Sequence, residues 1–394
     1  MKAIEVKKGI YWVGAIDWNL RNFHGYLTQR GSSYNAYLII DEKITLVDTV
    51  KAQLTSEMMS RISSIIDPAK IDYVVCNHIE MDHSGALPAI MELAPSALVI
   101  ASSKGVTGLK EHYRQEWNCK AMESGTILNL GKRNLHFILT PMVHWPDNMI
   151  GYLAEDKILF SNDAFGQHLA SSERFDDEFP LDIAMMEARK YYANIVLPYS
   201  KQVEKALVAA SGLDIDIIAN SHGIIWRKYV KEILHAYHEW AANEVGKKAL
   251  IIYDTMWHST EQMAISIQET FESLDYKTEL LSLQHNHISD IMTHVIGAEY
   301  ICLGSPTLNG RMLPSMAAFL TYLSGLAPKN RKAIVFGSYG WGPKNIEEMS
   351  QELEKNGFEV IAREKIKYVP TQESLDEMKK RLKIVILSRA VKVF

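Results

Sequence analysis

The sequence predicts an α/β protein of two domains, the second of them a doubly wound parallel sheet. Three observations lead to this prediction. With 394 residues, the chain is too long for one ordinary hydrophobic core. In residues 1–247, several short apolar segments end on histidine or a carboxylate, whereas residues 248–394 alternate strand-like and helix-like segments. The polar run NEVGKK at residues 243–248 separates the two patterns and marks the expected domain boundary.

Composition limits the possible functions. Hydrophobic residues make up 47% and charged residues 23% of the chain, as in soluble globular proteins. A formal net charge of -5 gives no reason to expect nucleic acid or an acidic membrane surface as a partner. The N-terminal segment carries charges where a signal peptide needs an apolar centre, and no apolar run reaches the length of a membrane span. We therefore expect a cytoplasmic protein.

The three cysteines, Cys76, Cys119 and Cys302, are odd in number, widely spaced and contain no CxxC pair. This arrangement predicts neither a disulfide framework nor a rubredoxin-type iron site. Their expected role is core packing.

The N-terminal segment begins with strand-like runs at residues 9–17, 33–41 and 43–49, which predict a sheet. Asp48 ends the third run, where it either serves a nearby site or caps the following segment. An amphipathic pattern then predicts a helix over residues 53–66, closed by the Asp-Pro pair that follows.

A candidate metal-binding loop follows the apolar run IDYVVC at residues 71–76. The loop NHIEMDHSGALP brings His78, Glu80, Asp82 and His83 within six residues, directly after a predicted buried strand. Imidazole and carboxylate ligands without a thiolate suit iron, manganese or zinc. The alternative is a polar loop whose histidines bond the backbone. Four potential ligands in so short a segment favour the metal.

Three later strands end in the same way. The chain continues with helical segments at residues 86–93 and 106–117, strands within 126–141, a hairpin at 149–166, a helical stretch at 180–210 and a strand at 214–220. His144, Asp163 and His222 each lie just beyond a strand, as His78 does. Loops at one edge of stacked sheets converge in space, so these residues are expected at one site. Taken singly, Asp163 could be a turn residue, His144 could pack against Trp145, and His222 could donate to a carbonyl.

Residues 248–394 contain five strand-helix units, with strands at 249–255, 277–283, 299–307, 332–340 and 359–366. This alternation predicts a parallel sheet covered by helices on both faces, with ligands at the carboxyl ends of its strands. The first turn contains hydroxyl groups and unpaired backbone N–H groups at a helix N-terminus, which favour a phosphate. A serine N-cap with nothing bound is the alternative. The residues of this turn are Thr255, Met256, Trp257, His258, Ser259 and Thr260.

The ends of the third and fourth strands add glycines, which permit close backbone approach, and aromatic side chains on which a flat ring can stack. Together with the phosphate turn they predict flavin mononucleotide (FMN). No GxGxxG motif occurs, so a dinucleotide is less favoured. These candidate flavin-binding residues are Ser305, Pro306, Thr307, Leu308, Asn309, Gly310, Ser338, Tyr339, Gly340, Trp341 and Gly342.

Over essentially its whole length the chain resembles the flavodiiron proteins. The family motif H-x-E-x-D-H is found as His78, Glu80, Asp82 and His83, and the similarity extends to MVHWPD, SNDAFG, SHG, YDTMWHST, GSPTLNG and SYGWG. The resemblance implies a metallo-β-lactamase-like αββα sandwich over residues 1–247 and a flavodoxin-like, doubly wound parallel sheet over residues 248–394. Hydrolases of the metallo-β-lactamase fold have histidine where this chain has Glu80, and the added negative charge suits a redox diiron centre better than hydrolytic zinc.

The resemblance also implies the ligand sets. His78, Glu80 and His144 would bind one iron, Asp82, His83 and His222 the other, and Asp163 would bridge them. His24, Tyr191 and Tyr192 are candidates to line the gas pocket, with ordinary packing as the alternative for each. The phosphate turn departs from the simplest flavodoxin pattern, because it has no glycine between Thr255 and Thr260.

The implied activity is reduction of dioxygen to water, of nitric oxide to nitrous oxide, or of both, with electrons relayed through FMN. No rubredoxin domain follows the flavodoxin-like segment, so an external donor is expected: rubredoxin, another flavoprotein or a reduced deazaflavin. Family members form head-to-tail homodimers or dimers of dimers, which we expect here. Two rival functions remain at this stage: a dinuclear zinc hydrolase, and a non-catalytic electron carrier or gas sensor. The sequence leaves the choice between oxygen and nitric oxide open.

Overall fold

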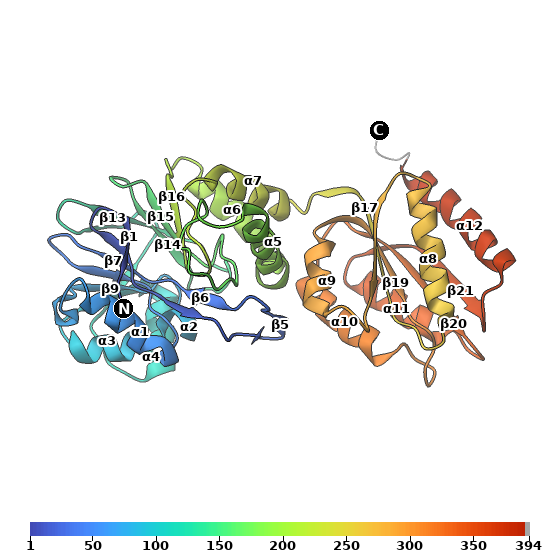
Figure 1. Cartoon of the computed structure of the whole chain (residues 1–394), viewed down its shortest axis with the longest axis horizontal. Helices are drawn as coiled ribbons and strands as arrows, with labels where there is room; N and C mark the ends of the chain where they lie inside the picture. Colours follow the sequence, from blue (N-terminus) through green and yellow to red (C-terminus); the bar gives the residue numbers. More distant parts are fainter. Residues whose placement is uncertain (391–394) are drawn as a thin grey trace. The chain divides into compact units, whose positions relative to one another are not determined.

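The computed structural model describes residues 1–390 and divides into two compact units (Figure 1). The first unit contains residues 1–192 and 199–241, and the second contains residues 193–198 and the chain from residue 242 onward. The first strand of the second unit, β17, begins at Val245, earlier than the expected start at residue 248. The polar run that suggested a linker is the solvent-exposed beginning of this strand, so its composition resembles that of a loop.

The first unit is built on two stacked sheets. A seven-stranded sheet has the order β1-β2-β7-β8-β9-β10-β11, and a five-stranded sheet has the order β12-β13-β14-β15-β16. Two short pairs, β3 with β6 and β4 with β5, lie outside them. The strands are β1 (Ile4–Lys7), β2 (Ile10–Trp12), β3 (Ala15–Asp17), β4 (Asn22–Phe23), β5 (Tyr26–Leu27), β6 (Ser32–Tyr34), β7 (Tyr37–Ile39), β8 (Thr45–Val47), β9 (Tyr73–Val75), β10 (Leu98–Ser102), β11 (Cys119–Met122), β12 (Ile127–Asn129), β13 (Asn134–Leu139), β14 (Met149–Leu153), β15 (Ile158–Asn162) and β16 (Ile217–Asn220).

Every second side chain of these strands points into the space between the two sheets, and apolar side chains of this kind form the core there. Ile158 and Phe160 of β15 join the inter-sheet core, together with Val47 and Val75 from the other sheet. Leu159 lies between the first two and belongs to the opposite face, because successive side chains of a strand point to opposite sides. The αββα sandwich expected for the first unit is therefore present.

Helices cover the outer faces of this sandwich. Helices α1, α3 and α4 pack on the seven-stranded sheet through residues such as Ile62, Leu87 and Leu109. The helices of the first unit are α1 (Thr55–Ser63), α2 (Met81–Ser84), α3 (Leu87–Leu93), α4 (Ser103–Tyr113), α5 (Leu181–Tyr191), α6 (Ser200–Ala210) and α7 (Val230–Ala241). Short 3-10 turns lie at Ala52–Leu54, Pro68–Lys70 and Leu197–Tyr199, and a π-helical turn at Tyr192–Val196.

Several predicted boundaries shift for local reasons. Helix α4 begins before residue 106 because the Ser102 hydroxyl accepts a hydrogen bond from Gly105 N at 3.0 Å, and it ends where Arg114 adopts φ 53°. The run predicted as one strand at residues 9–17 is two strands. They separate near Gly14, where a side chain would meet Tyr34 O at 2.2 Å. The predicted helical stretch 180–210 is α5 and α6 with the π and 3-10 turns between them.

The second unit is a five-stranded parallel sheet with the order β18-β17-β19-β20-β21. In order along the chain this is 2-1-3-4-5, the doubly wound order of flavodoxin. Ile251, Cys302 and Phe336 of the sheet form a core with Phe271 and Leu382 of the helices. The elements are β17 (Val245–Tyr253), α8 (Ser259–Glu272), β18 (Lys277–Ser282), α9 (Ile288–Val295), β19 (Gly297–Gly304), α10 (Pro314–Leu326), β20 (Lys332–Tyr339), α11 (Lys344–Lys355), β21 (Glu359–Lys367) and α12 (Gln372–Ala390).

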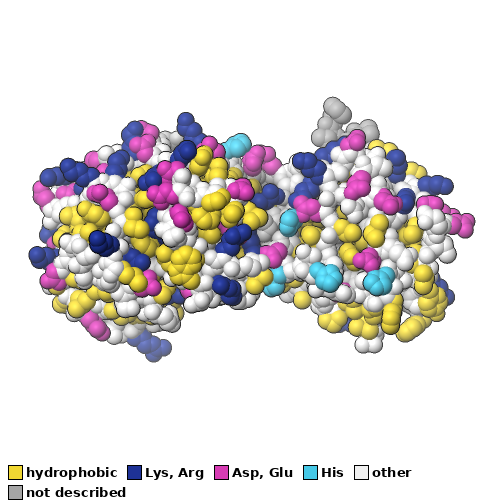
Figure 2. Space-filling view, viewed as in Figure 1, with side chains coloured by type: hydrophobic (Ala, Val, Ile, Leu, Met, Phe, Trp, Pro, Cys, Tyr) yellow, Lys and Arg dark blue, Asp and Glu magenta, His cyan; other side chains and the backbone are white. Residues whose placement is uncertain are grey.

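The three cysteines are free thiols, as predicted. Cys76 and Cys302 are buried in hydrophobic cores, and Cys119 is partly buried beside the first of these cores. Lys and Arg side chains are interspersed with Asp and Glu over the visible face of each unit in Figure 2, as the small net charge suggests. In residues 1–390, no helix combines the length and the apolar character that crossing a membrane requires.

Candidate metal centre and flavin pocket

The predicted metal ligands all lie where strands of the first unit end. His78 follows β9, and the short helix α2 presents Asp82 and His83 one after the other. Asp163 follows β15 and His222 follows β16. His144 lies in the loop between β13 and β14, and Glu80 immediately precedes α2. The structure brings these seven side chains together at one edge of the sandwich.

One set of side chains surrounds the Oδ2 atom of Asp163. His78 Nε2 lies 3.7 Å and His144 Nε2 lies 3.4 Å from this oxygen. Glu80 Oε2 lies 3.4 Å from His78 Nε2 and 3.3 Å from His144 Nε2. The ligand atoms of His78, His144 and Asp163 are close enough together to hold one metal ion.

A second set surrounds the other oxygen of the same carboxylate. His83 Nε2 lies 3.1 Å and His222 Nε2 lies 3.3 Å from Asp163 Oδ1. The Asp82 carboxylate contacts both imidazoles, at 3.3 Å from His83 and 3.4 Å from His222. Asp163 therefore presents one oxygen to each set, which is the geometry of a carboxylate that bridges two cations.

Charge and burial both favour a cation here. Burial alone raises the pKa of Asp163, but the neighbouring imidazoles of His83, His222 and His144 outweigh it and hold the pKa well below its usual range. For His83, burial lowers the pKa, whereas Asp82 and Asp163 raise it to about 9. Both carboxylate oxygens of Asp82 and of Asp163 are buried without a hydrogen-bond partner among the described residues. Buried carboxylates in this state require a counterion, and a pair of metal ions satisfies them.

Two histidines of the centre are oriented through their second ring nitrogen. His78 Nδ1 lies 3.0 Å from Asp147 Oδ2, and the same oxygen accepts the backbone N–H of Ile79 at 2.9 Å. His222 Nδ1 lies 2.9 Å from the carbonyl oxygen of Ser33. Such contacts fix the ring and its tautomer. Sequence reasoning missed Asp147 and Ser33 as orienting groups, although Asp147 lies within the quoted motif MVHWPD.

Asp48 has the site-serving role that the sequence left open. Its Oδ1 accepts the backbone N–H of Asn77 at 2.8 Å, and its Oδ2 accepts the Asn77 side-chain amide at 3.1 Å and that of Asn162 at 3.3 Å. Burial raises the pKa of this carboxyl. Asn77 precedes His78 and Asn162 precedes Asp163, so Asp48 joins the ends of three strands directly behind the ligands.

A cavity of about 290 Å³ opens beside the metal ligands. Glu80 and Asp82 line it together with His24 and Lys51. His24 is largely exposed, and its Nε2 lies 3.1 Å from Glu80 Oε1. The structure therefore places His24 at an opening that leads to the centre.

The two predicted pocket tyrosines differ in position. Tyr191 is buried with its ring centroid 5.8 Å from that of His222, and burial, followed by the charge of Asp163, raises its pKa well above the ordinary value. Tyr192 instead contacts Ser200 through its hydroxyl at 3.0 Å and packs 5.1 Å from Tyr237. Successive helical residues point in different directions, so Tyr192 takes the packing role that was its alternative.

His168 is a further buried group that the sequence did not single out. It lies between Tyr191 and His222, with ring centroids 5.1 Å and 5.0 Å away, and its Nδ1 lies 2.8 Å from the Ser32 hydroxyl. Burial lowers its pKa well below the ordinary value, so the imidazole is neutral. Its sequence context, GQHLA after the SNDAFG turn, offers no spacing signal.

The second unit has a pocket of about 280 Å³ at the carboxyl ends of its strands. Nine predicted flavin residues line it: Thr255, Met256, Trp257, Ser259, Pro306, Thr307, Ser338, Tyr339 and Gly340. The Oγ1 atom of Thr255 is buried without a partner among the described residues, so a phosphate oxygen or an amide can bond it. Trp257 is 87% exposed, as expected for an aromatic ring that a ligand covers.

The other predicted residues of this site lie behind or beside the pocket. Thr260 and Ser305 are buried, and the Thr260 hydroxyl lies 3.1 Å from that of Ser338. His258 contacts Glu261 at 2.7 Å, and Trp341 is 93% exposed at the rim. Leu308 pairs with Arg311 around the turn at Asn309 and Gly310, and Gly342 follows Trp341.

Two family models cover most of the chain. Residues 33–223 match a model described as ODP family beta lactamase, and residues 251–380 match the flavodoxin model. A nitric oxide reductase of Moorella thermoacetica is 44% identical over 94% of this chain and 95% of that protein. The structure of rubredoxin oxygen:oxidoreductase from Desulfovibrio gigas superposes with a TM-score of 0.96 at 40% identity over the full length of both chains. The flavodiiron protein of Giardia intestinalis superposes with a TM-score of 0.94 at 35% identity, over 98% of this chain and 96% of that chain.

The chain belongs to the flavodiiron protein family. It is therefore an oxidoreductase with a metallo-β-lactamase-like domain and a flavodoxin domain, and its cofactors are a diiron centre and FMN. The residues present fit both groups. The unpartnered carboxylates of Asp82 and Asp163 suit a pair of cations, and the second pocket has a free threonine hydroxyl and an exposed indole.

In this flavodiiron protein the pocket of the second unit is also lined by two residues that the sequence did not predict, Tyr368 and Val369. They follow β21, the fifth strand, and Tyr368 N donates to Tyr339 O at 2.8 Å. The sequence does contain a signal for these two residues: they follow the fifth predicted strand, and the carboxyl ends of neighbouring parallel strands lie at one edge of the sheet. The sequence-based prediction rests on the ends of the first, third and fourth strands alone.

Proposed function

We propose that this flavodiiron protein reduces dioxygen to water, nitric oxide to nitrous oxide, or both, with electrons relayed through FMN from an external donor. The observation that carries the proposal is the pair of three-residue ligand sets that share Asp163. Two adjacent metal ions suit a small diatomic substrate that requires several electrons.

The relatives support both substrates. The Moorella protein is named a nitric oxide reductase, and the Desulfovibrio protein is named for rubredoxin and oxygen. A rubredoxin-type donor is therefore proposed for this chain as well. Anaerobic gas consumption by the reduced enzyme will decide between the two gases.

We assign the metal ligands as the resemblance implied. His78, Glu80 and His144 would hold one iron, Asp82, His83 and His222 the other, with Asp163 bridging. Bound irons would supply the electrons at the substrate gas. The protein residues hold the ligands in place: Asp147 orients His78, Ser33 orients His222, and Asp48 fixes the strand ends that carry His78 and Asp163.

Two further residues are proposed at the gas pocket. His24 lies at the opening next to Glu80, and Tyr191 lies against His222 with a pKa that keeps its hydroxyl protonated. Tyr191 can therefore donate a hydrogen bond toward the side of the centre near Asp163. His24 is positioned to exchange protons between solvent and the side of the metal centre that contains Glu80.

In the flavin pocket, the first turn of α8 would bind the phosphate through Thr255, Ser259 and the free N–H groups of the helix. Trp257 and Tyr368 offer rings on which the isoalloxazine can stack. We also propose the head-to-tail homodimer of the family, which would pair the flavin of one subunit with the irons of the other. Sedimentation analysis tests this arrangement, and a monomer that is fully active would contradict it.

The decisive experiment is anaerobic gas consumption by the reduced enzyme, with oxygen and nitric oxide compared at matched concentrations. We expect two irons and one FMN per chain, and turnover with at least one gas. Two zinc ions and turnover that survives flavin loss would instead indicate a hydrolase. Bound iron and flavin without steady-state consumption would indicate an electron carrier or a gas sensor.

The ligand assignment has its own test. Asp163→Ala removes a carboxylate that contacts both ligand sets, and His222→Ala removes a ligand of one set. Both variants should lose gas reduction and iron while keeping full FMN content, since the flavin pocket lies in the other unit. Retained turnover in either variant would count against the assignment.

A further inference from the structure

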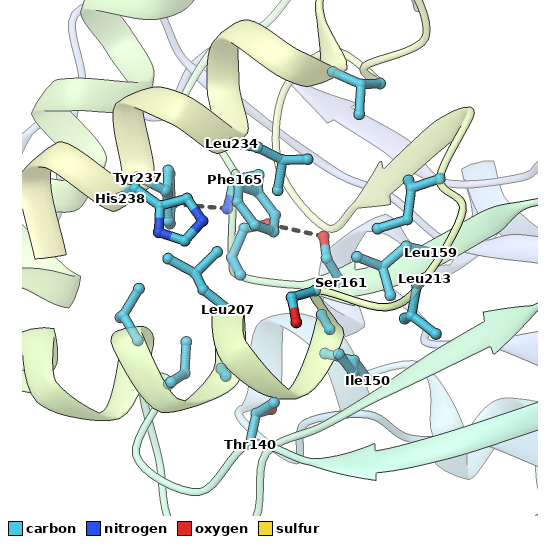
Figure 3. Close-up of a pocket in the computed structure, with 18 of the residues that line it drawn as sticks. Thr140, Ile150, Leu159, Ser161, Phe165, Leu207, Leu213, Leu234, Tyr237 and His238 are labelled. Carbon is cyan, nitrogen blue, oxygen red and sulfur yellow. Dashed lines mark hydrogen bonds between the residues drawn. The ribbon is translucent and has the colours of Figure 1, made fainter.

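A second cavity in the first unit lies away from the opening that contains His24. It has a volume of about 400 Å³ and lies between helices α6 and α7 and the outer face of the five-stranded sheet (Figure 3). This is within the range of roughly 300–1,000 Å³ that is typical of pockets for small organic ligands. Well-packed interiors contain few voids of this size. The residues that line it come from four elements and their loops: Thr140, Val143, Ile150, Leu159, Ser161, Ala164, Phe165, Val203, Ala206, Leu207, Ala210, Ser211, Leu213, Asp214, Ile215, Val230, Lys231, Leu234, Tyr237 and His238.

Most of the side chains that line the interior of this cavity are apolar. Leu159 of β15 faces it, while its neighbours Ile158 and Phe160 face the inter-sheet core. Leu207 of α6 and Leu234 of α7 line the opposite wall, as Figure 3 shows. A ligand for this space must therefore have an apolar body, whose transfer from water into the cavity is favourable.

The rim is polar and contains one lysine, one aspartate and one histidine: Lys231, Asp214 and His238. Asp214, an acidic residue at the rim, is already paired with Lys157 at 2.5 Å. Lys231 and His238 are exposed, and within residues 1–390 neither side chain forms an ion pair or a hydrogen bond. They are separated by seven residues on α7 and so project from the same side of the helix. An anionic group at the rim can pair with Lys231, because the rim carboxylate Asp214 is already paired with Lys157.

We propose that this cavity binds a monoanionic amphiphile, a medium-chain fatty acid, with its chain between α6 and α7 and its carboxylate at Lys231. At roughly 30 Å³ for each non-hydrogen group, the volume of one water molecule in the liquid, a cavity of about 400 Å³ accommodates about 13 groups. A saturated chain of about twelve carbons fits this estimate.

The cavity adjoins the segment that carries a metal ligand. Ala164 and Phe165 of its wall directly follow Asp163. Phe165 N donates to the Tyr237 hydroxyl at 2.7 Å, and Trp226 Nε1 donates to Phe165 O at 2.9 Å. A chain bound between α6 and α7 therefore contacts the backbone that positions Asp163, at a site separate from the opening beside His24.

Binding of three twelve-carbon probes to the full-length protein with its cofactors tests the proposal by calorimetry, below the micelle concentrations of the two ionic probes and the solubility limit of the alcohol. The probes are dodecanoate, 1-dodecanol and dodecyltrimethylammonium, which share a chain and differ in head-group charge. We expect one dodecanoate per chain and at least fivefold weaker binding of the cationic probe. Absence of dodecanoate binding, or equal affinity for all three probes, would overturn the proposal.

Two substitutions locate the site. Leu207→Trp fills the cavity and should abolish dodecanoate binding, whereas Val208→Trp makes the same kind of change at the next residue, which is 71% exposed and does not line the cavity. Lys231→Glu should weaken dodecanoate binding at least fivefold and leave 1-dodecanol unchanged, with Lys205→Glu on the exposed side of α6 as its control. Binding that survives Leu207→Trp, or that falls equally in the control variants, would place the fatty acid elsewhere and refute the assignment.

Discussion

The candidate metal centre could be predicted from the sequence because its histidines and carboxylates are residue types that bind metals. His78, Glu80, Asp82 and His83 were grouped by their spacing alone, and His144, Asp163 and His222 were added because each follows a strand. The structure brings all seven together. Residues that act through a ligand were not found, because an aspartate that orients a histidine has the same sequence appearance as any loop aspartate.

Asp147→Asn is expected to weaken iron binding about 10–100-fold without unfolding the protein. The substitution keeps the size of the side chain and an oxygen for Ile79 N, but it removes the charge that holds His78 Nδ1. Titration of the metal-free protein with ferrous iron under anaerobic conditions measures the effect. Asp67→Asn, at an exposed 3-10 turn, is the matched control. Equal affinities in the two variants would refute the orienting role of Asp147.

At the scale of elements, the site depends on how strand ends are held together. Strand β15 lies more than 80 residues beyond β8 and β9 along the chain, yet the ends of all three strands meet at Asp48 through Asn77 and Asn162. The sequence showed that Asp48 ends a strand but not which other strands it would reach. Sheet order, which depends on pairing between distant segments, decides that.

Asp48→Ala should destabilise the first unit by about 2–4 kcal/mol, since it leaves several buried N–H donors without an acceptor. Thermal unfolding of the metal-free protein should show a lower Tm for this unit, with little change in the flavodoxin-like unit. Glu42→Ala, an exposed substitution near the end of the preceding strand, should leave both transitions in place. A Tm shift of similar size in that control would contradict the explanation.

In the second unit, Glu279 joins β18 to two other elements and gives a pH-dependent prediction. Burial raises its pKa, but hydrogen bonds with His294 of α9 and Lys248 of β17 outweigh this and lower it from 4.5 to about 2. A lowered folded-state pKa stabilises the fold above the unfolded value, and this contribution is lost as pH falls from about 4.5 through about 2. The group is partly exposed, so solvent screening reduces the contribution to about 1 kcal/mol.

Glu279→Gln should therefore cost about 1 kcal/mol of unfolding free energy at pH 7, and the difference from the parent protein should shrink steadily below pH 4.5. Urea unfolding of the flavodoxin-like unit, on metal-free protein at each pH, measures both values. Glu269→Gln, which affects a more exposed pair with Lys379, should show a smaller effect at pH 7. A difference in unfolding free energy that grows as the pH falls would contradict the predicted direction of the pH dependence.

At the scale of the whole molecule, the two units have separate cores and separate cofactor sites. The proposed metal ligands lie at the sheet edge of one unit, and the pocket proposed for FMN lies at the carboxyl ends of the strands of the other. Loss of one cofactor should therefore leave the other in place. Donor-driven turnover should nevertheless require both.

Ser259→Asp tests this independence. A carboxylate at the first position of α8 repels the flavin phosphate, so the variant should lose FMN and donor-driven gas reduction while it keeps two irons per chain. Flavin absorbance, iron analysis and gas consumption on one preparation provide the three readouts. Gln372→Asp places the same charge at the N-terminus of α12, away from the pocket, and should keep FMN. Turnover without flavin would contradict the proposed relay.

The sequence by itself determined the two-domain organisation and the parallel sheet of the second unit, and it predicted the seven candidate metal ligands that the structure brings together. These features depend on local properties: apolar periodicity, residue type and position after a strand. The approximate element boundaries follow from the same signals, and some of them shift where a cap such as Ser102 or a close contact such as that at Gly14 intervenes.

Only the tertiary structure decided how those residues combine. It showed that Asp163 offers one oxygen to each ligand set, that Tyr191 faces the centre while Tyr192 packs against Tyr237, and that Tyr368 completes the flavin pocket. Each of these facts depends on the direction of a side chain or on contact between distant segments. Neither is encoded in local sequence, because packing of the whole chain sets both.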